Sequence, residues 1–137
     1  MSTKEIIENK ISYIKKQVAV AKKYQHYSLE GLEKEDMIKS VVERELYVTA
    51  QAVIDLAEAM IALKNLRKPT TMREAFDILG EVGILPKEFL VDFSKIVGFR
   101  NALAHDYQDL KIEAIYNVLQ NKLKQVEQFI SYVEASL

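Results

Sequence analysis

The residues best suited to chemistry lie in one short stretch, Arg100 to Tyr107, which reads RNALAHDY. It supplies a permanent cation, an amide, an imidazole, a carboxylate and a phenol, and it holds one of the chain's two histidines. Cleaving an RNA phosphodiester without metal requires that the 2′-hydroxyl lose a proton, that the 5′-oxygen gain one, and that phosphoryl charge be stabilised. Imidazole suits the proton transfers and a planar guanidinium suits phosphate oxygens. The stretch is therefore a candidate RNA-cleaving site.

The spacing of the stretch constrains its geometry. In a helix, Asn101 and His105 lie one turn apart on a single face, because they are four positions apart. Arg100 and His105 are five positions apart, so they diverge unless the helix loosens. The polar pair Gln108–Asp109 predicts that the helix ends just after Tyr107. The stretch would then occupy the last turn of a helix, where the dipole favours a protonated imidazole.

Two features of the stretch predict a second copy of the chain. Arg100 falls on the apolar stripe traced by Phe89, Phe93 and Ile96, where an arginine is costly unless it is paired or faces a partner. General acid and base catalysis usually needs two groups, and this stretch has one histidine. A twofold dimer with this face at its seam would bring two copies of His105 and Arg100 into one cleft.

A polar line within the predicted second helix has two interpretations. Arg44, Tyr47, Gln51 and Asp55 follow one another at spacings of three and four. The favoured interpretation is a solvent-exposed face. The alternative is a second wall of the active cleft, with Asp55 orienting Arg100 or His105.

The composition restricts the class of protein. The chain has 137 residues, of which 49% are hydrophobic, and this suits a single domain over residues 1–137 with a real core. The net charge is −1, so no broad basic surface for long nucleic acid is expected. There are no cysteines, and two histidines without a cluster argue against a metal site. No signal peptide and no apolar run near membrane-spanning length is evident, which predicts a cytoplasmic protein without membrane contact.

Hydrophobic periodicity predicts an all-α bundle of about five helices. Gly31 separates the first two, a Thr71 capping box begins the third, Pro86 lies in the first turn of the fourth, and Asp109 caps the last. His26 is expected to bind free carbonyls at the end of the first helix. Four lysines of that helix form either a solvated face, which we favour, or a phosphate-facing patch: Lys15, Lys16, Lys22 and Lys23. The predicted helices are 3–24, 34–65, 72–79, 86–105 and 109–136.

The chain also resembles a known family. It resembles the HepT-type toxins, which are minimal HEPN-domain ribonucleases of prokaryotic toxin–antitoxin pairs. Their sequence motif is an arginine followed after four residues by a histidine and, after one further residue, by a tyrosine. An asparagine usually follows the arginine directly. All four motif positions are present here, as Arg100, Asn101, His105 and Tyr107. The similarity extends more loosely over Val42–Phe129, and the order of helices agrees with the family along nearly the whole chain.

The resemblance implies a toxin that is a metal-independent endoribonuclease, works as a homodimer and needs no cofactor. Arg100 and His105 would be catalytic at the dimer interface, and Asn101 would position His105 or the phosphate. The implied partner is a minimal nucleotidyltransferase antitoxin of the MntA type, which can neutralise the toxin by transferring AMP to the motif tyrosine, Tyr107 here. Two alternatives stay open: a non-catalytic module that binds a nucleotide or a nucleotidyltransferase, and a purely structural dimerisation bundle.

Overall fold

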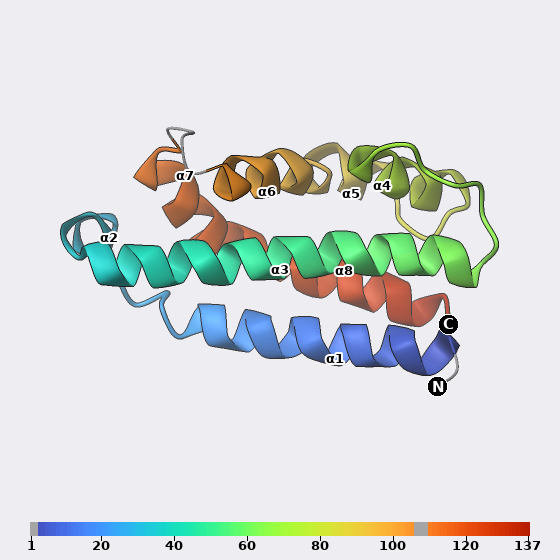
Figure 1. The fold of residues 1–137 in the computed structure, drawn as a ribbon, viewed down its shortest axis with the longest axis horizontal. Coiled ribbons are helices and arrows are strands. Elements are labelled where there is room, and N and C mark those ends of the chain that lie inside the picture. The colour runs from blue at the N-terminus through green and yellow to red at the C-terminus, as the bar shows by residue number, and fades with distance from the viewer. Residues whose placement is uncertain (1–2, 106–109) are drawn as a thin grey trace.

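The protein is a layered bundle of helices built around one long central helix. The computed structural model describes residues 3–105 and 110–137, and all regular structure in those residues is helical, as predicted. The central helix α3 (Asp36–Leu63) has α1 (Thr3–Lys22) along one side and a row of shorter helices along the other (Figure 1). The remaining elements are α2 (Leu29–Lys34), α4 (Met72–Glu81), α5 (Lys87–Phe93), α6 (Ile96–Ala104), α7 (Ile112–Asn117), the π-helical turn η1 (Val118–Lys122) and α8 (Leu123–Ala135).

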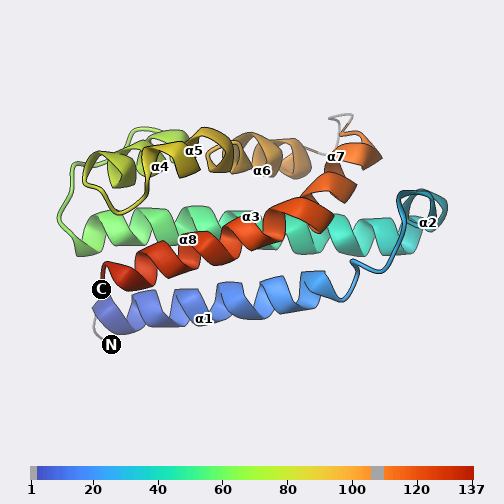
Figure 2. The same ribbon diagram turned by 180° about the vertical axis from the view of Figure 1, so that it is seen from behind.

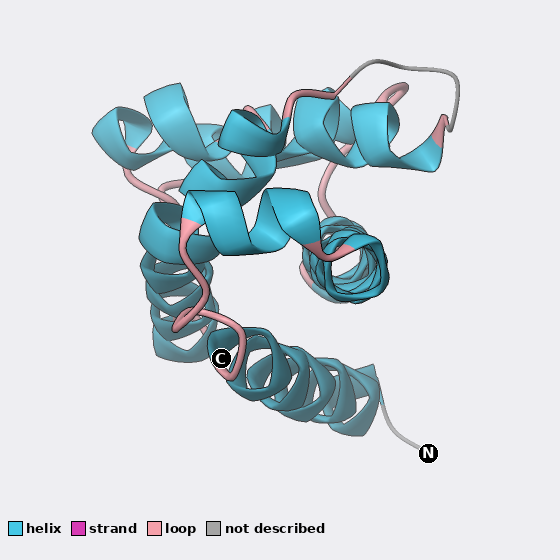
Figure 3. Cartoon of the chain, turned by 90° about the vertical axis from the view of Figure 1, so that its left-hand side faces the viewer, coloured by secondary structure: helices cyan, strands magenta, loops and turns pink. Residues whose placement is uncertain are grey.

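Helix α3 forms contacts with α1, α4 and α6 and is the core helix of the bundle. The back view shows α8 crossing it obliquely, and the end view shows the layers on its two sides (Figures 2 and 3). No apolar run near membrane-spanning length is evident in the sequence, but α3 is long and apolar enough to cross a membrane by length and composition alone. Half of its most apolar window is buried inside the chain, as in the core helix of a globular fold.

Around α3, the first helix agrees with its prediction and the second does not. The predicted apolar stripe of α1 is buried. The expected break at Gly31 is wrong, because this glycine lies inside the short helix α2, whose Ser28 cap accepts a hydrogen bond from the Gly31 amide at 2.9 Å. The central helix consequently begins at Asp36 rather than at Lys34.

The N-terminal cap of α4 agrees with the prediction from the sequence. Its two glycines have different roles, since one lies within the helix and the other follows it. The Glu74 amide donates to Thr71 Oγ1 at 3.0 Å, and Glu74 reaches back to the Thr70 amide at 2.8 Å. Gly80 lies within α4, where a Cβ would approach Leu90 Cδ1 to 2.5 Å, so it allows α4 and α5 to pack closely. Gly83 follows the helix at φ +80°, a conformation that favours glycine.

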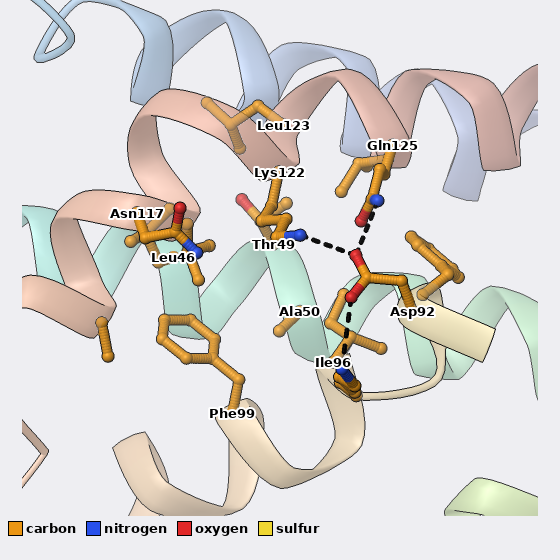
Figure 4. Close-up of a pocket in the computed structure, with 15 residues that line it drawn as sticks. Leu46, Thr49, Ala50, Asp92, Ile96, Phe99, Asn117, Lys122, Leu123 and Gln125 are labelled. Carbon is orange, nitrogen blue, oxygen red and sulfur yellow. Dashed lines mark hydrogen bonds and ion pairs between the residues drawn. The ribbon is translucent and has the colours of Figure 1, made fainter. Parts of the chain in front are cut away.

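The predicted fourth helix is broken into α5 and α6. At the break, the Lys95 amide bonds to the Asp92 carbonyl and the Val97 amide to the Ser94 carbonyl, three positions back instead of four. This tighter turn ends α5 and redirects the chain. Asp92 at the break accepts hydrogen bonds from Lys122 Nζ at 2.6 Å and Gln125 Nε2 at 2.8 Å, which join it to η1 and α8 (Figure 4). These contacts, led by that with Lys122, lower the pKa of Asp92 to about 2.

The predicted last helix is interrupted by the π-helical turn η1. A π turn leaves the i→i−4 ladder, and here the side chain of Gln25 donates to the Leu119 carbonyl at 2.9 Å. The Gln120 side chain returns a hydrogen bond to the Gln25 carbonyl at 2.7 Å. The predicted cap Asp109 lies outside the described residues, and Lys111 occupies the N-cap of α7.

Candidate functional site

Helix α6 carries the motif and ends inside it. The helix closes at Ala104, and His105 follows at its C-cap with φ −106° and ψ 97°. This end agrees with the predicted helix range 86–105 and comes before the end just after Tyr107 that the Gln108–Asp109 pair predicts. Because His105 leaves the helical path, helix geometry does not stack it over Asn101. The exposed imidazole stands at the end of the helix, and Tyr107 lies outside the described residues.

Arg100 on α6 is fixed by three neighbours. Its Nε donates to Gln51 Oε1 at 2.6 Å, and its Nη1 donates to Asn101 Oδ1 at 2.9 Å. Its Cζ lies 5.6 Å from the centre of the Tyr47 ring, within the range of a cation–π contact. An arginine on an otherwise apolar face therefore has the partners that its half-buried position requires.

Gln51 extends this network to a carboxylate. Its Nε2 donates to Asp55 Oδ1 at 2.9 Å, while its Oε1 accepts from Arg100. One orientation of the amide satisfies both contacts, since Arg100 needs an acceptor and Asp55 needs a donor. Asp55 thus reaches Arg100 through Gln51.

The favoured interpretation of the polar line on α3, a solvent-exposed face, is wrong for Tyr47 and Gln51, because both contact Arg100. The spacing of four between Tyr47, Gln51 and Asp55 was the available signal, since it places all three on the same face of α3. What periodicity does not specify is which neighbouring helix that face meets.

Helix α6 is held on one side only. Within the described part of the chain, none of its residues is fully buried, although Ile96, Val97, Phe99 and Leu103 pack against the core. Behind it, Ile96 and Phe99 line an apolar cavity of about 290 Å³ shared with α3, η1 and α8 (Figure 4). On its outer side Gly98 is exposed, and a Cβ built there meets no described atom within 4 Å. Packing within one copy therefore does not explain this helix-interior glycine.

A polar hollow lies beside the motif, between α3 and the end of α6. Its volume is about 420 Å³. It borders the site at two points: Tyr47, which contacts Arg100, and Ala104, which precedes His105. The residues that line it are Ser40, Glu43, Arg44, Tyr47, Leu103 and Ala104.

The other candidates from the sequence have structural roles. His26 Nδ1 lies 2.8 Å from the Lys23 carbonyl at the end of α1, which agrees with the prediction of a helix-end histidine. Lys15 and Lys22 form ion pairs with Glu134 at 3.2 Å and Glu127 at 2.9 Å on α8. These pairs support the favoured reading of the lysines as a solvated face.

Two proteins named as nucleases are similar to this chain over almost their whole length. The mRNA nuclease HepT of Shewanella oneidensis is 31% identical over 133 residues, covering 96% of this chain and 98% of the relative. The tRNA nuclease HepT of Aphanizomenon flos-aquae is 26% identical over 132 residues, covering 96% and 90%. These relatives carry different RNA classes in their names.

Solved structures agree with the fold over the same span. A toxin–antitoxin complex with AMP-PNP superposes with a TM-score of 0.87 at 27% identity, covering 96% of this chain and 98% of the other. The tri-AMPylated HEPN toxin of Shewanella oneidensis, in complex with its MNT antitoxin, superposes with a TM-score of 0.86 at 27% identity, covering 98% and 99%. The predicted HEPN-like helical fold is confirmed by these likenesses. The model of the ribonuclease HepT-like family matches residues 14–133, and the chain therefore belongs to that family.

Proposed function

We propose that this protein is the toxin of a toxin–antitoxin pair and cleaves RNA in the cytoplasm without a metal ion. The observation that carries the proposal is the network that holds the Arg100 guanidinium on α6, the helix that ends at the exposed His105. Arginine held by Gln51 and Asn101 is preorganised to receive a phosphate, since ordering its long side chain costs nothing further when substrate binds. The family assignment supports the same reaction class.

In the proposed reaction an imidazole removes the proton from the 2′-hydroxyl of the substrate. The 2′-oxygen then bonds to phosphorus, and the bond from phosphorus to the 5′-oxygen breaks. A second group gives a proton to the leaving 5′-oxygen, so the products are a 2′,3′-cyclic phosphate and a 5′-hydroxyl. His105 supplies the proton transfers, Arg100 stabilises the negative charge on the phosphoryl oxygens, and Asn101 positions Arg100.

The second proton-transfer group would come from a second copy of the chain. A homodimer seam along α6 is supported by the lack of a fully buried residue on this helix among the described residues, and by the open space above Gly98. A twofold axis near this helix would bring two imidazoles and two guanidiniums into one cleft. The two copies of His105 would then divide the roles of acid and base.

We also propose that a nucleotidyltransferase antitoxin neutralises the toxin by modifying Tyr107. The tyrosine oxygen would attack the α-phosphorus of ATP, forming a tyrosyl adenylate and releasing pyrophosphate. An adenylate two residues from His105 would block the cleft and repel the phosphates of RNA. The solved relatives support this step, since one is a tri-AMPylated toxin bound to an MNT antitoxin.

The nuclease proposal is tested by His105→Ala and Arg100→Ala, with His26→Ala as the matched histidine control. Purified proteins are incubated with RNA in EDTA, and the products are examined for 2′,3′-cyclic phosphate ends. Wild type and His26→Ala should cleave, whereas the two motif variants should lose about 1,000-fold or more in rate while keeping the helical circular dichroism spectrum. Cleavage by His105→Ala, or loss of wild-type cleavage in EDTA, would overturn the mechanism. Intact RNA with wild type, combined with binding of ATP or AMP, would favour the non-catalytic module.

The modification is tested by incubating the toxin with ATP and the nucleotidyltransferase encoded beside it. Intact-mass spectrometry should show adenylate added to wild type and to the control Tyr13→Phe, whose site is on the exposed face of α1. Tyr107→Phe should remain unmodified and toxic. Adenylate on Tyr107→Phe would show that another residue is the acceptor.

A further inference from the structure

The hollow beside the motif is lined by two neighbouring residues of opposite charge, Glu43 and Arg44. Neither the Glu43 nor the Arg44 side chain has a hydrogen bond or an ion pair with another residue in ranges 3–105 and 110–137. The charge of Arg44 acts on its neighbour Glu45, since burial raises the pKa of that carboxyl and the nearby guanidinium partly lowers it. Two adjacent, opposite charges that make no hydrogen bond or ion pair within the described residues, and that line a hollow, are available to a ligand.

The rest of the lining suits a nucleotide. Leu103 and Ala104 provide an apolar wall from α6, and the Tyr47 ring adds an aromatic one. Bases of single-stranded RNA stack on such surfaces, and their edges present N–H donors to carboxylates. A guanidinium binds phosphate through its fork of donors. The apolar and aromatic walls of the hollow, together with Glu43, therefore suit the base of a nucleotide. Arg44 suits its phosphate.

The location of the hollow relative to the motif indicates which nucleotide of the RNA substrate it would bind. Tyr47 contacts Arg100 on one side of the hollow, and Ala104 leads directly into His105 on another. Whatever fills the hollow lies next to the groups assigned to the cleaved bond. Building on the proposed function, we propose that this hollow binds the base and phosphate of the nucleotide adjoining that bond, and that Glu43 selects a base whose edge presents N–H donors.

In this scheme Glu43 and Arg44 contribute to the affinity for RNA and not to the cleavage step, because neither side chain reaches the reacting atoms. Loss of the Arg44 contact weakens binding for every sequence, whereas loss of the Glu43 carboxylate changes which bases are tolerated. Two relatives carry different RNA classes in their names, mRNA and tRNA, and residues beside the motif are therefore candidates for the choice of RNA.

The test compares Arg44→Ala and Glu43→Gln with two exposed control variants, Arg73→Ala on α4 and Glu58→Gln on α3. Cleavage rates are measured on short oligoribonucleotides that vary the base on each side of the cut. Arg44→Ala should raise KM by about 10-fold with kcat changed by less than about 2-fold, and should lower the salt-dependence slope of binding by about 1. Glu43→Gln should reduce the preference among bases by about 10-fold or more.

The outcomes distinguish this inference from the function on which it rests. If wild type cleaves, and Arg44→Ala and Glu43→Gln match their controls in KM and base preference, the hollow is not a nucleotide site and the nuclease assignment stands. A fall in kcat alone would place these residues in the chemistry, against the inference. If wild type does not cleave, the proposed function fails first. The affinity of the same oligonucleotides for the His105→Ala protein is then compared with that for the His105→Ala, Arg44→Ala double variant. Weaker binding by the double variant supports the nucleotide site, and equal binding overturns it.

Discussion

Two regions of this bundle are held in place in different ways. Between α4, α5 and α8, four phenylalanines and a tyrosine pack ring against ring, with centroids 4.7 to 6.0 Å apart. Next along the chain, α6 has no fully buried residue among those described, and a cavity that Phe93 also lines lies behind it. The first region supplies stability. The second presents the motif and leaves one side for a substrate or a partner. The densest ring packing and the motif therefore lie in different parts of one small fold.

Phe129→Ala against Phe99→Ala is the strongest test of this contrast. Phe129 is fully buried and stacks on Phe93 with centroids 5.1 Å apart, so its loss should lower the free energy of unfolding by about 4 kcal/mol. Phe99 is half-buried beside an existing cavity, and its loss should cost about 1 to 2 kcal/mol. Urea unfolding followed by circular dichroism measures both. Equal costs would remove the distinction between the two regions.

Gln51→Ala should affect the site more than the fold. It leaves the Nε of Arg100 without its acceptor and Asp55 without its donor. We expect RNA cleavage to slow by about 10-fold, or about 1.4 kcal/mol in the activation barrier, with a smaller change in unfolding. Gln128→Ala on the exposed face of α8 is the control. Unchanged cleavage would show that Gln51 does not position Arg100.

Asp92→Asn tests the connection between the two regions. The folded-state pKa of Asp92, about 2, lies below its usual 3.8, so its contribution to stability is present above pH 4 and is lost as the pH falls from about 4 to 2. Because this carboxylate is 37% exposed, solvent screening reduces the contribution to about 1 kcal/mol. Thermal unfolding at pH 2 to 7 should show wild type and variant converging at the acid end. A constant difference across this range would contradict the linkage.

Gly98→Ala should give the smallest change in stability, and in the opposite direction. The helix has room for the methyl group, so the free energy of unfolding of one copy should rise by up to about 1 kcal/mol. If a partner copy or RNA approaches this glycine closely, sedimentation velocity or cleavage assays should show weaker dimerisation or activity in the same variant. Higher stability with both properties unchanged would leave the glycine without a contact role.

The sequence predicted the structure best where residues within one helix determine it. The apolar stripe of α1, the Thr71 cap of α4 and the helix-end role of His26 all follow from local spacing and local hydrogen bonds. It predicted the structure less well where contacts with residues far along the chain interrupt a helix that the local pattern predicts to be continuous. The break between α5 and α6 and the π turn η1 are stabilised by contacts with residues far along the chain, which periodicity does not contain.

The same division holds for the candidate site. The sequence by itself determined the all-α fold, the family and the motif, because these depend on residue types and short spacings. Tertiary structure alone decided that Tyr47 and Gln51 contact Arg100, and that Asp55 is connected to Arg100 only through Gln51. It also formed the hollow of Glu43 and Arg44 beside Ala104. The physical reason is that a helical pattern specifies which residues share a face, whereas the packing of α3 against α6 specifies what that face meets.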